Sequence, residues 1–209
     1  MQARSAHTRH KLVVAGAQTF GREGYASATM EQIARGAGVT KGALYFHFAS
    51  KSDLADAVQE QACAALRGHL DAQRRTERAP VQQLIDLTYW LARSLHQDPL
   101  IRAGCRLAAE CVSPPAGVPG LRQAWIREVV LLLGRARQSG SLHPGAVQDG
   151  PEALLSAAVC GLESLAGTGL ELPQLLGRVA ALWAVLLPTL VPAGDLGRYH
   201  RQAPPAVAR

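Results

Sequence analysis

The sequence predicts an all-α protein with a three-helix N-terminal domain at residues 1–50, a larger helical body at residues 51–192 and a flexible tail at residues 193–209. Apolar residues make up 48% of the chain, alanine and leucine are prominent, and β-branched residues are sparse, which favours helices over sheet. Apolar side chains recur at helical spacing between short runs rich in glycine and proline. The 209 residues are enough to bury a sizeable core.

The first two helices are predicted from apolar spacing and from end signals. Apolar positions recur near helical spacing from Thr8 to Gly24, where the glycine supplies a C-terminal stop. The motif "TMEQ" at Thr29–Gln32 is a capping box, in which the threonine hydroxyl accepts from a backbone N–H while the glutamine side chain reaches back. A short second helix follows and ends at Gly36.

A third short helix is predicted from its cap, Thr40, through Phe46. The sequence spacing between key residues of the second and third helices is informative. Counted from Met30, the places five, nine, ten and fifteen hold Ala34, Gly38, Val39 and Leu44. This order puts a small residue where two helices touch, a glycine in the turn and aliphatic residues in the mini-core. The spacing therefore predicts a helix-turn-helix.

The body is predicted to contain six helices, the first of which opens with a second capping signal, "SKSD". Their expected bounds are 50–75, 80–96, 99–111, 121–140, 151–166 and 172–187. The run "VSPPAGVPG" is expected to be a loop because its prolines lack backbone N–H groups, and "SLHPGAVQDG" is expected to be another. The most apolar run, Val179–Leu190, is short for a membrane span and contains Pro188.

Positive charge is concentrated at the N-terminal end. Residues 1–52 hold seven of the 22 lysines and arginines and two of the 16 acidic residues, so they carry +5 of the formal net charge of +6. A basic end on a near-neutral body favours a polyanionic partner for that end. The alternative is a solvated basic face that only keeps the protein soluble.

The segment "VTKGALYFHFASK" puts three aromatic rings and a histidine into four consecutive positions of a chain with only 5% aromatic residues. If its helix enters the major groove, Gly42 and Ala43 leave the helix surface bare for a close approach to the bases. Tyr45 would then bond a phosphate and Phe46 would meet a thymine methyl. Other candidate phosphate contacts are Thr29, Lys41, Lys51 and His47.

The alternative for this segment is that its aromatic rings are core residues. We expect Leu44 and Phe48 to face inward and Tyr45 and Phe46 to face DNA. The sequence leaves His47 open between a phosphate donor and a packed ring.

The motifs of several other protein classes are missing from the sequence. The four cysteines are scattered, without the spacing of a zinc site or a disulfide framework, so no metal or cofactor is expected. No G-x-S-x-G, phosphate-binding glycine loop or H-E-x-x-H motif occurs, which argues against an enzyme. The N-terminus lacks the apolar stretch of a signal peptide, so we expect a reduced, cytoplasmic protein without membrane attachment.

The run "GYASATMEQIARGAGVTKGALYFHFASKSDLADAV", Gly24–Val58, resembles the DNA-binding head of TetR-type transcriptional regulators. The variant "TKGALYFHFASK" is similar to the subgroup of γ-butyrolactone autoregulator receptors and related signalling-furan receptors. The body matches this subgroup more loosely, in "LIRAGCRLA" and in Trp125 after a proline-rich loop.

This resemblance implies a helical homodimer that represses transcription from operator DNA and releases it when a small molecule enters the body. It implies DNA contacts at Thr40, Lys41, Gly42, Tyr45, Phe46 and Lys51. An alternative is a regulator of the same fold that answers an antibiotic or a biosynthetic intermediate, or that has lost the lactone response.

The resemblance also directs attention to the body for ligand and dimer contacts. It matches Trp125 to a recurring pocket tryptophan, and Gln61, Tyr89 and Ser164 are further candidate ligand contacts, although Trp125 and Tyr89 also suit an ordinary core. Ala153, Ala157 and Gly161 recur every four residues and form a stripe on which a second copy of the chain can pack. Burial of this stripe inside a monomer is the alternative.

Overall fold

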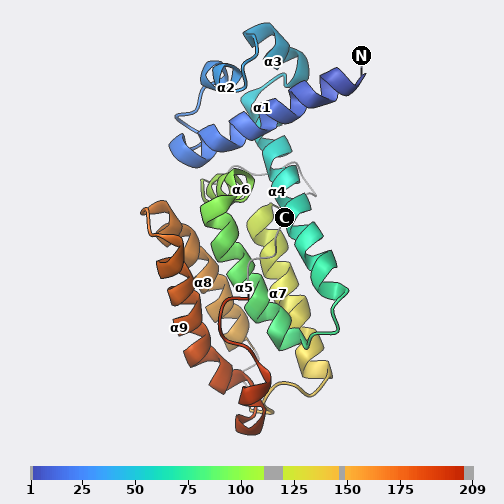
Figure 1. Cartoon of the computed structure of the whole chain (residues 1–209), viewed down its shortest axis with the longest axis vertical. Coiled ribbons are helices and arrows are strands. Elements are labelled where there is room, and N and C mark those ends of the chain that lie inside the picture. Colours follow the sequence, from blue (N-terminus) through green and yellow to red (C-terminus); the bar gives the residue numbers. More distant parts are fainter. Residues whose placement is uncertain (1, 111–119, 146–148, 205–209) are drawn as a thin grey trace. The chain divides into compact units, whose positions relative to one another are not determined.

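A computed structural model describes residues 2–110, 120–145 and 149–204, and every regular element in these ranges is helical (Figure 1). This confirms the predicted all-α class. The elements are α1 Gln2–Glu23, α2 Met30–Gly36, α3 Lys41–His47, α4 Lys51–Arg74, α5 Pro80–Gln97, α6 Pro99–Ala109, α7 Leu121–Gln138, α8 Gly150–Gly167, α9 Leu172–Leu190 and a 3₁₀ helix, η1, Ala193–Arg198. Cys111 and nearly all of the predicted loop at 112–120 lie outside the described residues.

The helices group into two compact units whose limits differ from the expected division at residue 50. Unit 1 comprises Met1–His69 and Asp98–Ala124, and unit 2 comprises Leu70–Gln97 and Trp125–Arg209. The difference arises because most of α4 joins the core of unit 1, and because α6, which belongs to the predicted body, packs along α1 of the predicted head.

Unit 1 has one hydrophobic core to which α1, α2, α3, α4 and α6 all contribute. Leu44 of α3 and Phe48 after it are 0% and 3% exposed, which confirms that both face inward. Gly104 of α6 lies against α4, and a Cβ atom at this glycine would come within 2.9 Å of the Cβ of Ala62. The Gln59 side chain crosses this contact and donates to the Gly104 carbonyl at 3.0 Å.

Two helices extend beyond their predicted ends by more than one residue. Helix α1 begins at Gln2 instead of Thr8, and the Thr8 hydroxyl donates back to the Arg4 carbonyl at 3.0 Å. Helix α9 continues past Leu187, through Pro188, to Leu190. The proline is tolerated because it lies on the exposed side of the last turn, where water can reach the carbonyl that it leaves without a donor.

Unit 2 is built around α5, which packs against α8 and α9. The indole N–H of Trp183 on α9 donates to the Thr88 hydroxyl on α5 at 2.7 Å, inside the unit. Glu128 of α7 is 5% exposed and pairs with Arg74 at 3.3 Å and with Arg135 at 3.4 Å. Burying a polar or charged group without a partner costs free energy, and these contacts supply the partners.

The C-terminal segment differs from the flexible tail expected at residues 193–209. Its described part forms η1 and then follows α5, and Tyr199 is only 8% exposed. Side chains of α5 bind its main chain: Tyr89 donates to the Arg201 carbonyl at 2.5 Å, and Arg93 donates to the Pro204 carbonyl. Contacts through the main chain do not require an apolar periodicity, so the sequence of this segment gave no sign of them. Residues 205–209 lie outside the described residues.

Candidate functional site

The exposed side of α3 has the composition predicted for a surface that meets DNA. Thr40 caps the helix by accepting from the Ala43 N–H at 3.1 Å. Lys41 and Gly42 lie exposed in the first turn, while Ala43 is half-buried. Nothing lies within 4 Å of the place where a Cβ atom of Gly42 would stand, so packing within the chain does not require a glycine there. A bare backbone at this place suits close approach by a partner.

Two aromatic rings of α3 point away from the core. Tyr45 is 45% exposed and Phe46 is 81% exposed. The ring of Phe46 meets His47 edge-on, with the ring centroids 5.2 Å apart, and His47 is half-buried. This contact leaves the ring nitrogens of His47 able to donate, so both roles that the sequence left open remain predictions. The exposed rings of Tyr45 and Phe46 agree with the prediction that both face outward from α3.

The N-terminus of α2 lies beside these residues in unit 1 and is fully capped. The Thr29 N–H donates to the Gln32 side-chain oxygen at 2.8 Å, and the Gln32 N–H donates to the Thr29 hydroxyl at 3.2 Å. The predicted capping box is confirmed. The Thr29 hydroxyl lies 2.8 Å from the same Gln32 oxygen, so donation to a phosphate would replace this internal bond.

Lys41 and Lys51 differ in their surroundings, although the sequence predicts a phosphate contact for both. Among the described residues, the ammonium group of Lys41 pairs only with the exposed Glu31, at 3.8 Å. The ammonium group of Lys51 instead donates to three backbone carbonyls of the loop between α1 and α2. Lys41 is therefore available to a phosphate, whereas the hydrogen bonds of Lys51 are used inside unit 1.

The comparisons with known proteins identify the family. Residues 12–58 match the family model described as "Bacterial regulatory proteins, tetR family". The chain is 31% identical to the A-factor receptor protein of Streptomyces griseus over 193 residues. This alignment covers 92% of this chain and 67% of the receptor. The chain belongs to the TetR family.

Solved structures extend this likeness to the body of the TetR-family chain. A crystal structure of a γ-butyrolactone receptor, described as an ArpA-like protein, has a TM-score of 0.81 and 31% identity, covering 93% of this chain and 94% of that one. CprB of Streptomyces coelicolor, solved in complex with its biological operator sequence, has a TM-score of 0.79 and 33% identity over 94% of each chain. Both matches include helices well beyond the helix-turn-helix.

The candidate ligand residues of this TetR-family chain lie in different surroundings. Trp125 is 1% exposed, and its indole N–H has no hydrogen-bond partner within the described part of the chain. Tyr89 is equally buried, but its hydroxyl already donates to the Arg201 carbonyl. Gln61 is half-buried on α4. Ser164 is exposed on α8, because a spacing of three from Gly161 puts it on the outer face, and its ligand contact remains a prediction.

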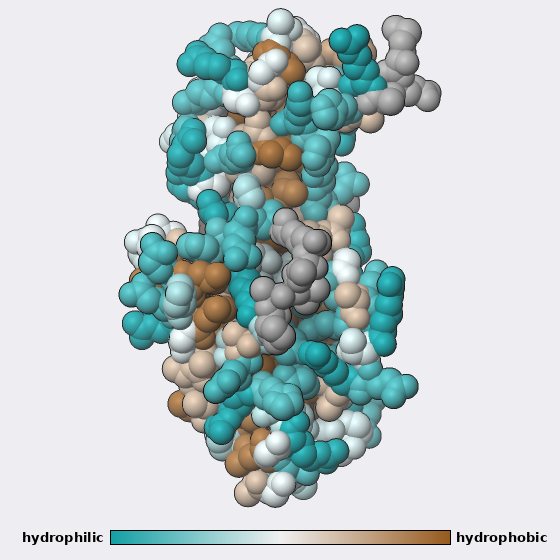
Figure 2. All heavy atoms as spheres, viewed as in Figure 1, coloured by the Kyte–Doolittle hydropathy of each residue, from teal (hydrophilic) through white to brown (hydrophobic). Residues whose placement is uncertain are grey.

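The outer faces of α8 and α9 are apolar and exposed in the single chain. Ala153, Ala157 and Gly161 are all exposed, together with Leu154 at 55%. On α9, Val185 is 75% exposed, and Figure 2 shows hydrophobic residues at the surface along the side of unit 2 where these helices lie. By length and composition alone α9 is apolar enough to cross a membrane. In the single chain, 28% of its most apolar 18-residue stretch is buried.

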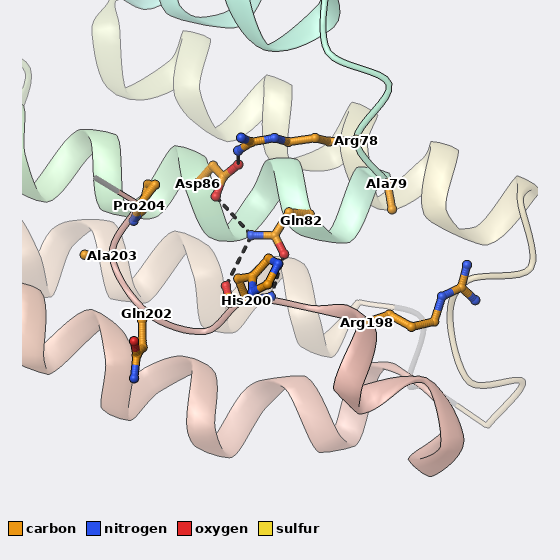
Figure 3. A pocket seen from close by; sticks show the side chains of 9 residues that line it. All are labelled: Arg78, Ala79, Gln82, Asp86, Arg198, His200, Gln202, Ala203 and Pro204. Carbon is orange, nitrogen blue, oxygen red and sulfur yellow. Dashed lines mark hydrogen bonds and ion pairs between the residues drawn. The ribbon is translucent and has the colours of Figure 1, made fainter. Parts of the chain in front are cut away.

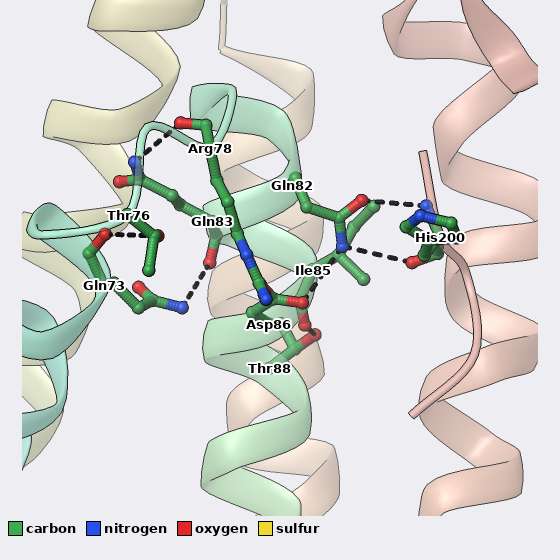
Figure 4. A network of polar contacts seen from close by, with 9 residues as sticks. All are labelled: Gln73, Thr76, Arg78, Gln82, Gln83, Ile85, Asp86, Thr88 and His200. Carbon is green, nitrogen blue, oxygen red and sulfur yellow. Dashed lines mark hydrogen bonds and ion pairs between the residues drawn. The ribbon is translucent and has the colours of Figure 1, made fainter. Parts of the chain in front are cut away.

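A pocket of about 530 Å³ lies between the start of α5 and the C-terminal segment (Figure 3). Its lining residues are Arg78, Ala79, Gln82, Asp86, Arg198, His200, Gln202, Ala203 and Pro204. Asp86 pairs with Arg78 and accepts from the Gln82 amide, which also binds the main chain of His200 (Figures 3 and 4). Because these polar groups satisfy one another, we interpret the pocket wall as a structural network.

Sequence reasoning did not find this network or the partners of Lys51. Gln82 is separated from His200 by 118 positions, and the carbonyls bound by Lys51 are 23 to 26 positions away from it. No periodicity or motif joins residues so far apart. Residues 2–110, 120–145 and 149–204 contain no cluster of three His, Cys, Asp or Glu side chains placed to hold a metal ion.

Proposed function

We propose that this chain is a transcriptional repressor that binds operator DNA as a homodimer and is released by a small signalling molecule such as a γ-butyrolactone or a related furan. Membership of the TetR family and the likeness to γ-butyrolactone receptors along the whole body support this proposal. The single observation that carries the DNA-binding half is the exposed surface of α3, where Tyr45 is 45% exposed, Phe46 is 81% exposed and the space beside Gly42 is open.

Each exposed group of α3 has a role in the proposed complex. Lys41 neutralises a phosphate, and the hydroxyls of Thr40 and Tyr45 donate to phosphate oxygens. Gly42 and the small Ala43 let the helix backbone approach the floor of the major groove, where the Phe46 ring meets a thymine methyl. Few side chains read bases in this arrangement, so much of the affinity comes from phosphates and falls with salt.

The indole N–H of Trp125 has no hydrogen-bond partner among the described residues, which supports the ligand-binding half of the proposal. A buried donor without an acceptor costs about 1–3 kcal/mol, so an acceptor that enters beside it is bound favourably. The carbonyl oxygen of a lactone supplies such an acceptor, and an alkyl tail suits apolar surroundings. A ligand that also contacts Tyr89 would first have to displace its hydroxyl from the Arg201 carbonyl.

A second copy of the chain is the proposed partner for the exposed faces of α8 and α9. The exposed small residues of α8 and the exposed Ala181, Ala184 and Val185 of α9 lie at spacings of three and four, so each helix presents one apolar face. Two such helices from each copy form a four-helix interface with closed two-fold symmetry. Two heads related by a two-fold axis suit a two-fold operator.

The test combines promoter DNA with candidate ligands. Fluorescence anisotropy measures binding of the purified protein to a labelled fragment of its own promoter region, against a scrambled fragment, at several salt concentrations. Lactones and furans are then titrated into the complex while tryptophan fluorescence is recorded. We expect specific binding that weakens with salt, and release by at least one ligand.

The Trp125→Phe variant tests the indole N–H, because it removes this donor and keeps an aromatic ring; the smaller ring also leaves a cavity at this buried position. We expect normal DNA binding and at least about a tenfold weaker ligand response, since a buried hydrogen bond is lost. Failure to bind any fragment would refute the DNA-binding half. Operator binding that no lactone or furan releases would refute the ligand class and favour a regulator that answers another molecule.

A further inference from the structure

Lys51, the first residue of α4, holds the loop between α1 and α2. Its ammonium group donates to the carbonyls of Tyr25 at 2.7 Å, Ala28 at 3.0 Å and Ala26 at 3.3 Å. The same nitrogen lies 4.5 Å from the centre of the Tyr25 ring. A lysine ammonium has three N–H donors and no acceptor, so three carbonyls use its full hydrogen-bonding capacity.

The location of this lysine is unfavourable for α4 itself. The N-terminus of a helix carries partial positive charge and favours acidic side chains, as Asp53 in the same turn illustrates. A lysine at the first helical position opposes this preference. Its presence is explained by the converging carbonyls of the loop, which offset the positive charge.

The loop that Lys51 binds leads directly into the first helix of the helix-turn-helix. Ala28, whose carbonyl it holds, precedes Thr29, the N-cap of α2. The loop has a second restraint from α6, because the Tyr25 N–H donates to a Glu110 carboxylate oxygen at 2.6 Å. Movement of the loop would therefore shift the N-terminus of α2, and with it α3, which packs against α2.

We propose that Lys51 is a positioning residue, which sets the place of the helix-turn-helix by holding the α1–α2 loop and does not serve as a phosphate contact. The consequence for DNA binding rests on the proposed function. The structural role does not, because it concerns the free protein.

Three variants distinguish a Lys51 that holds the α1–α2 loop from a Lys51 that contacts a phosphate. Lys51→Met removes the ammonium group and keeps most of the side-chain length. Lys51→Arg keeps the positive charge, but the planar guanidinium cannot place three donors on carbonyls that converge on one point. Lys41→Met is the matched control on α3, where the nearest ion-pair partner of the ammonium group among the described residues is the exposed Glu31 at 3.8 Å.

Amide hydrogen exchange of the free protein is the first measurement. The amides of Tyr25, Ala28 and Thr29 are each hydrogen-bonded, and the last two bonds lie within the loop and the cap of α2. We expect both Lys51 variants to speed their exchange by roughly tenfold to a hundredfold, as the loss of one or two charge-assisted bonds implies. Lys41→Met should leave these rates unchanged. Amides in the middle of α4 report whether each variant is folded.

The salt dependence of operator binding is the second measurement. Each lost phosphate contact lowers the slope of log K against log salt by about 0.9. We expect Lys41→Met to lower this slope, and both Lys51 variants to weaken binding at every salt concentration with the wild-type slope. The proposal is overturned if loop exchange is unchanged in Lys51→Met, or if Lys51→Arg binds like wild type while Lys51→Met lowers the slope.

The two measurements also keep this proposal separate from the proposed function. If the wild-type protein binds no promoter fragment, the regulatory function fails. The exchange rates of the free protein still decide whether Lys51 holds the loop.

Discussion

The amide side chain of Gln82 pairs with the main chain of His200 through two hydrogen bonds. Its nitrogen donates to the His200 carbonyl at 3.2 Å, and the His200 N–H donates to its oxygen at 2.8 Å. The same nitrogen donates to Asp86 at 3.0 Å (Figure 4). A glutamine on α5 thus holds a segment 118 positions away by its backbone.

Replacing Gln82 by methionine should loosen the C-terminal segment and destabilise unit 2. Gln82→Met keeps the volume but removes three hydrogen bonds, so we expect a loss of about 1–3 kcal/mol in the free energy of unfolding. Urea denaturation measures this loss. Gln97→Met, at the exposed end of the same helix, is the control and should change stability by less than about 0.5 kcal/mol. Equal effects of the two variants would contradict the role assigned to Gln82.

The buried hydroxyl of Tyr89 should make part of the stability depend on alkaline pH. Burial raises the pKa of this hydroxyl above its usual value, and the nearby Arg93 opposes only part of the rise. A raised pKa in the folded state means that the protonated form stabilises the fold. This contribution is complete below the unfolded value of about 10 and is lost as the pH rises through the folded value.

Tyr89→Phe isolates this contribution. The variant should be about 0.5–1.5 kcal/mol less stable near neutral pH because it cannot donate to the Arg201 carbonyl. The difference from wild type should shrink as the pH is raised above about 10. Denaturation curves between neutral and alkaline pH measure it. A difference that stays constant throughout would show that the hydroxyl proton does not stabilise the fold.

Gly42→Ala should raise stability while it lowers operator affinity. Nothing lies within 4 Å of the added methyl group, and alanine favours a helix over glycine by roughly 0.5–1 kcal/mol. The same methyl group would stand between α3 and the bases in the proposed complex. The control is Gly68→Ala on α4, where the space is equally open; it should raise stability and leave DNA binding unchanged. Unchanged operator affinity in Gly42→Ala would show that the backbone of α3 does not approach the bases closely at Gly42.

Ala157→Glu should convert the proposed dimer to monomers. The residue is exposed in the single chain, so the substitution leaves the fold of unit 2 intact but puts a carboxylate into the interface of both copies. Sedimentation velocity measures the change in mass. Ala72→Glu, exposed on α4, is the control and should remain dimeric. A dimer that persists in Ala157→Glu would rule out this face of α8.

Thiol labelling gives an independent measure of the same interface. Cys160 is exposed in the single chain and lies one position from Gly161, whereas Cys63 is buried. Burial also raises the pKa of the Cys63 thiol, which lowers its reactive thiolate fraction. We expect a maleimide to label Cys160 slowly in the wild-type dimer and quickly in Ala157→Glu, with Cys63 slow in both. Mass spectrometry of the digested protein assigns each site.

The helix-turn-helix and most helix bounds were predictable because their causes lie within a few residues. Thr29 and Gln32 cap α2, and Ser50 and Asp53 cap α4, each across three positions, as the structure confirms. The inward face of α3 follows from helical spacing, which puts Leu44 in the core and leaves Phe46 outside. The DNA contacts themselves remain predictions.

The roles that could not be predicted belong to side chains whose partners are backbone groups far along the chain. A lysine such as Lys51 beside exposed rings looks like a phosphate contact, although its ammonium group donates to carbonyls 23 to 26 positions away. The partners of such a side chain depend on which helices pack together, and local spacing alone does not specify that packing.

The amino-acid sequence by itself determined the helical class, the capping of the head helices and the basic, aromatic surface of α3. These features depend on local backbone preferences and on a helical period that any short segment carries. The tertiary structure decided that α6 joins the head, that Lys51 holds the α1–α2 loop and that Gln82 holds the C-terminal segment. A backbone carbonyl is the same acceptor in every residue, so only packing selects which one a distant side chain reaches.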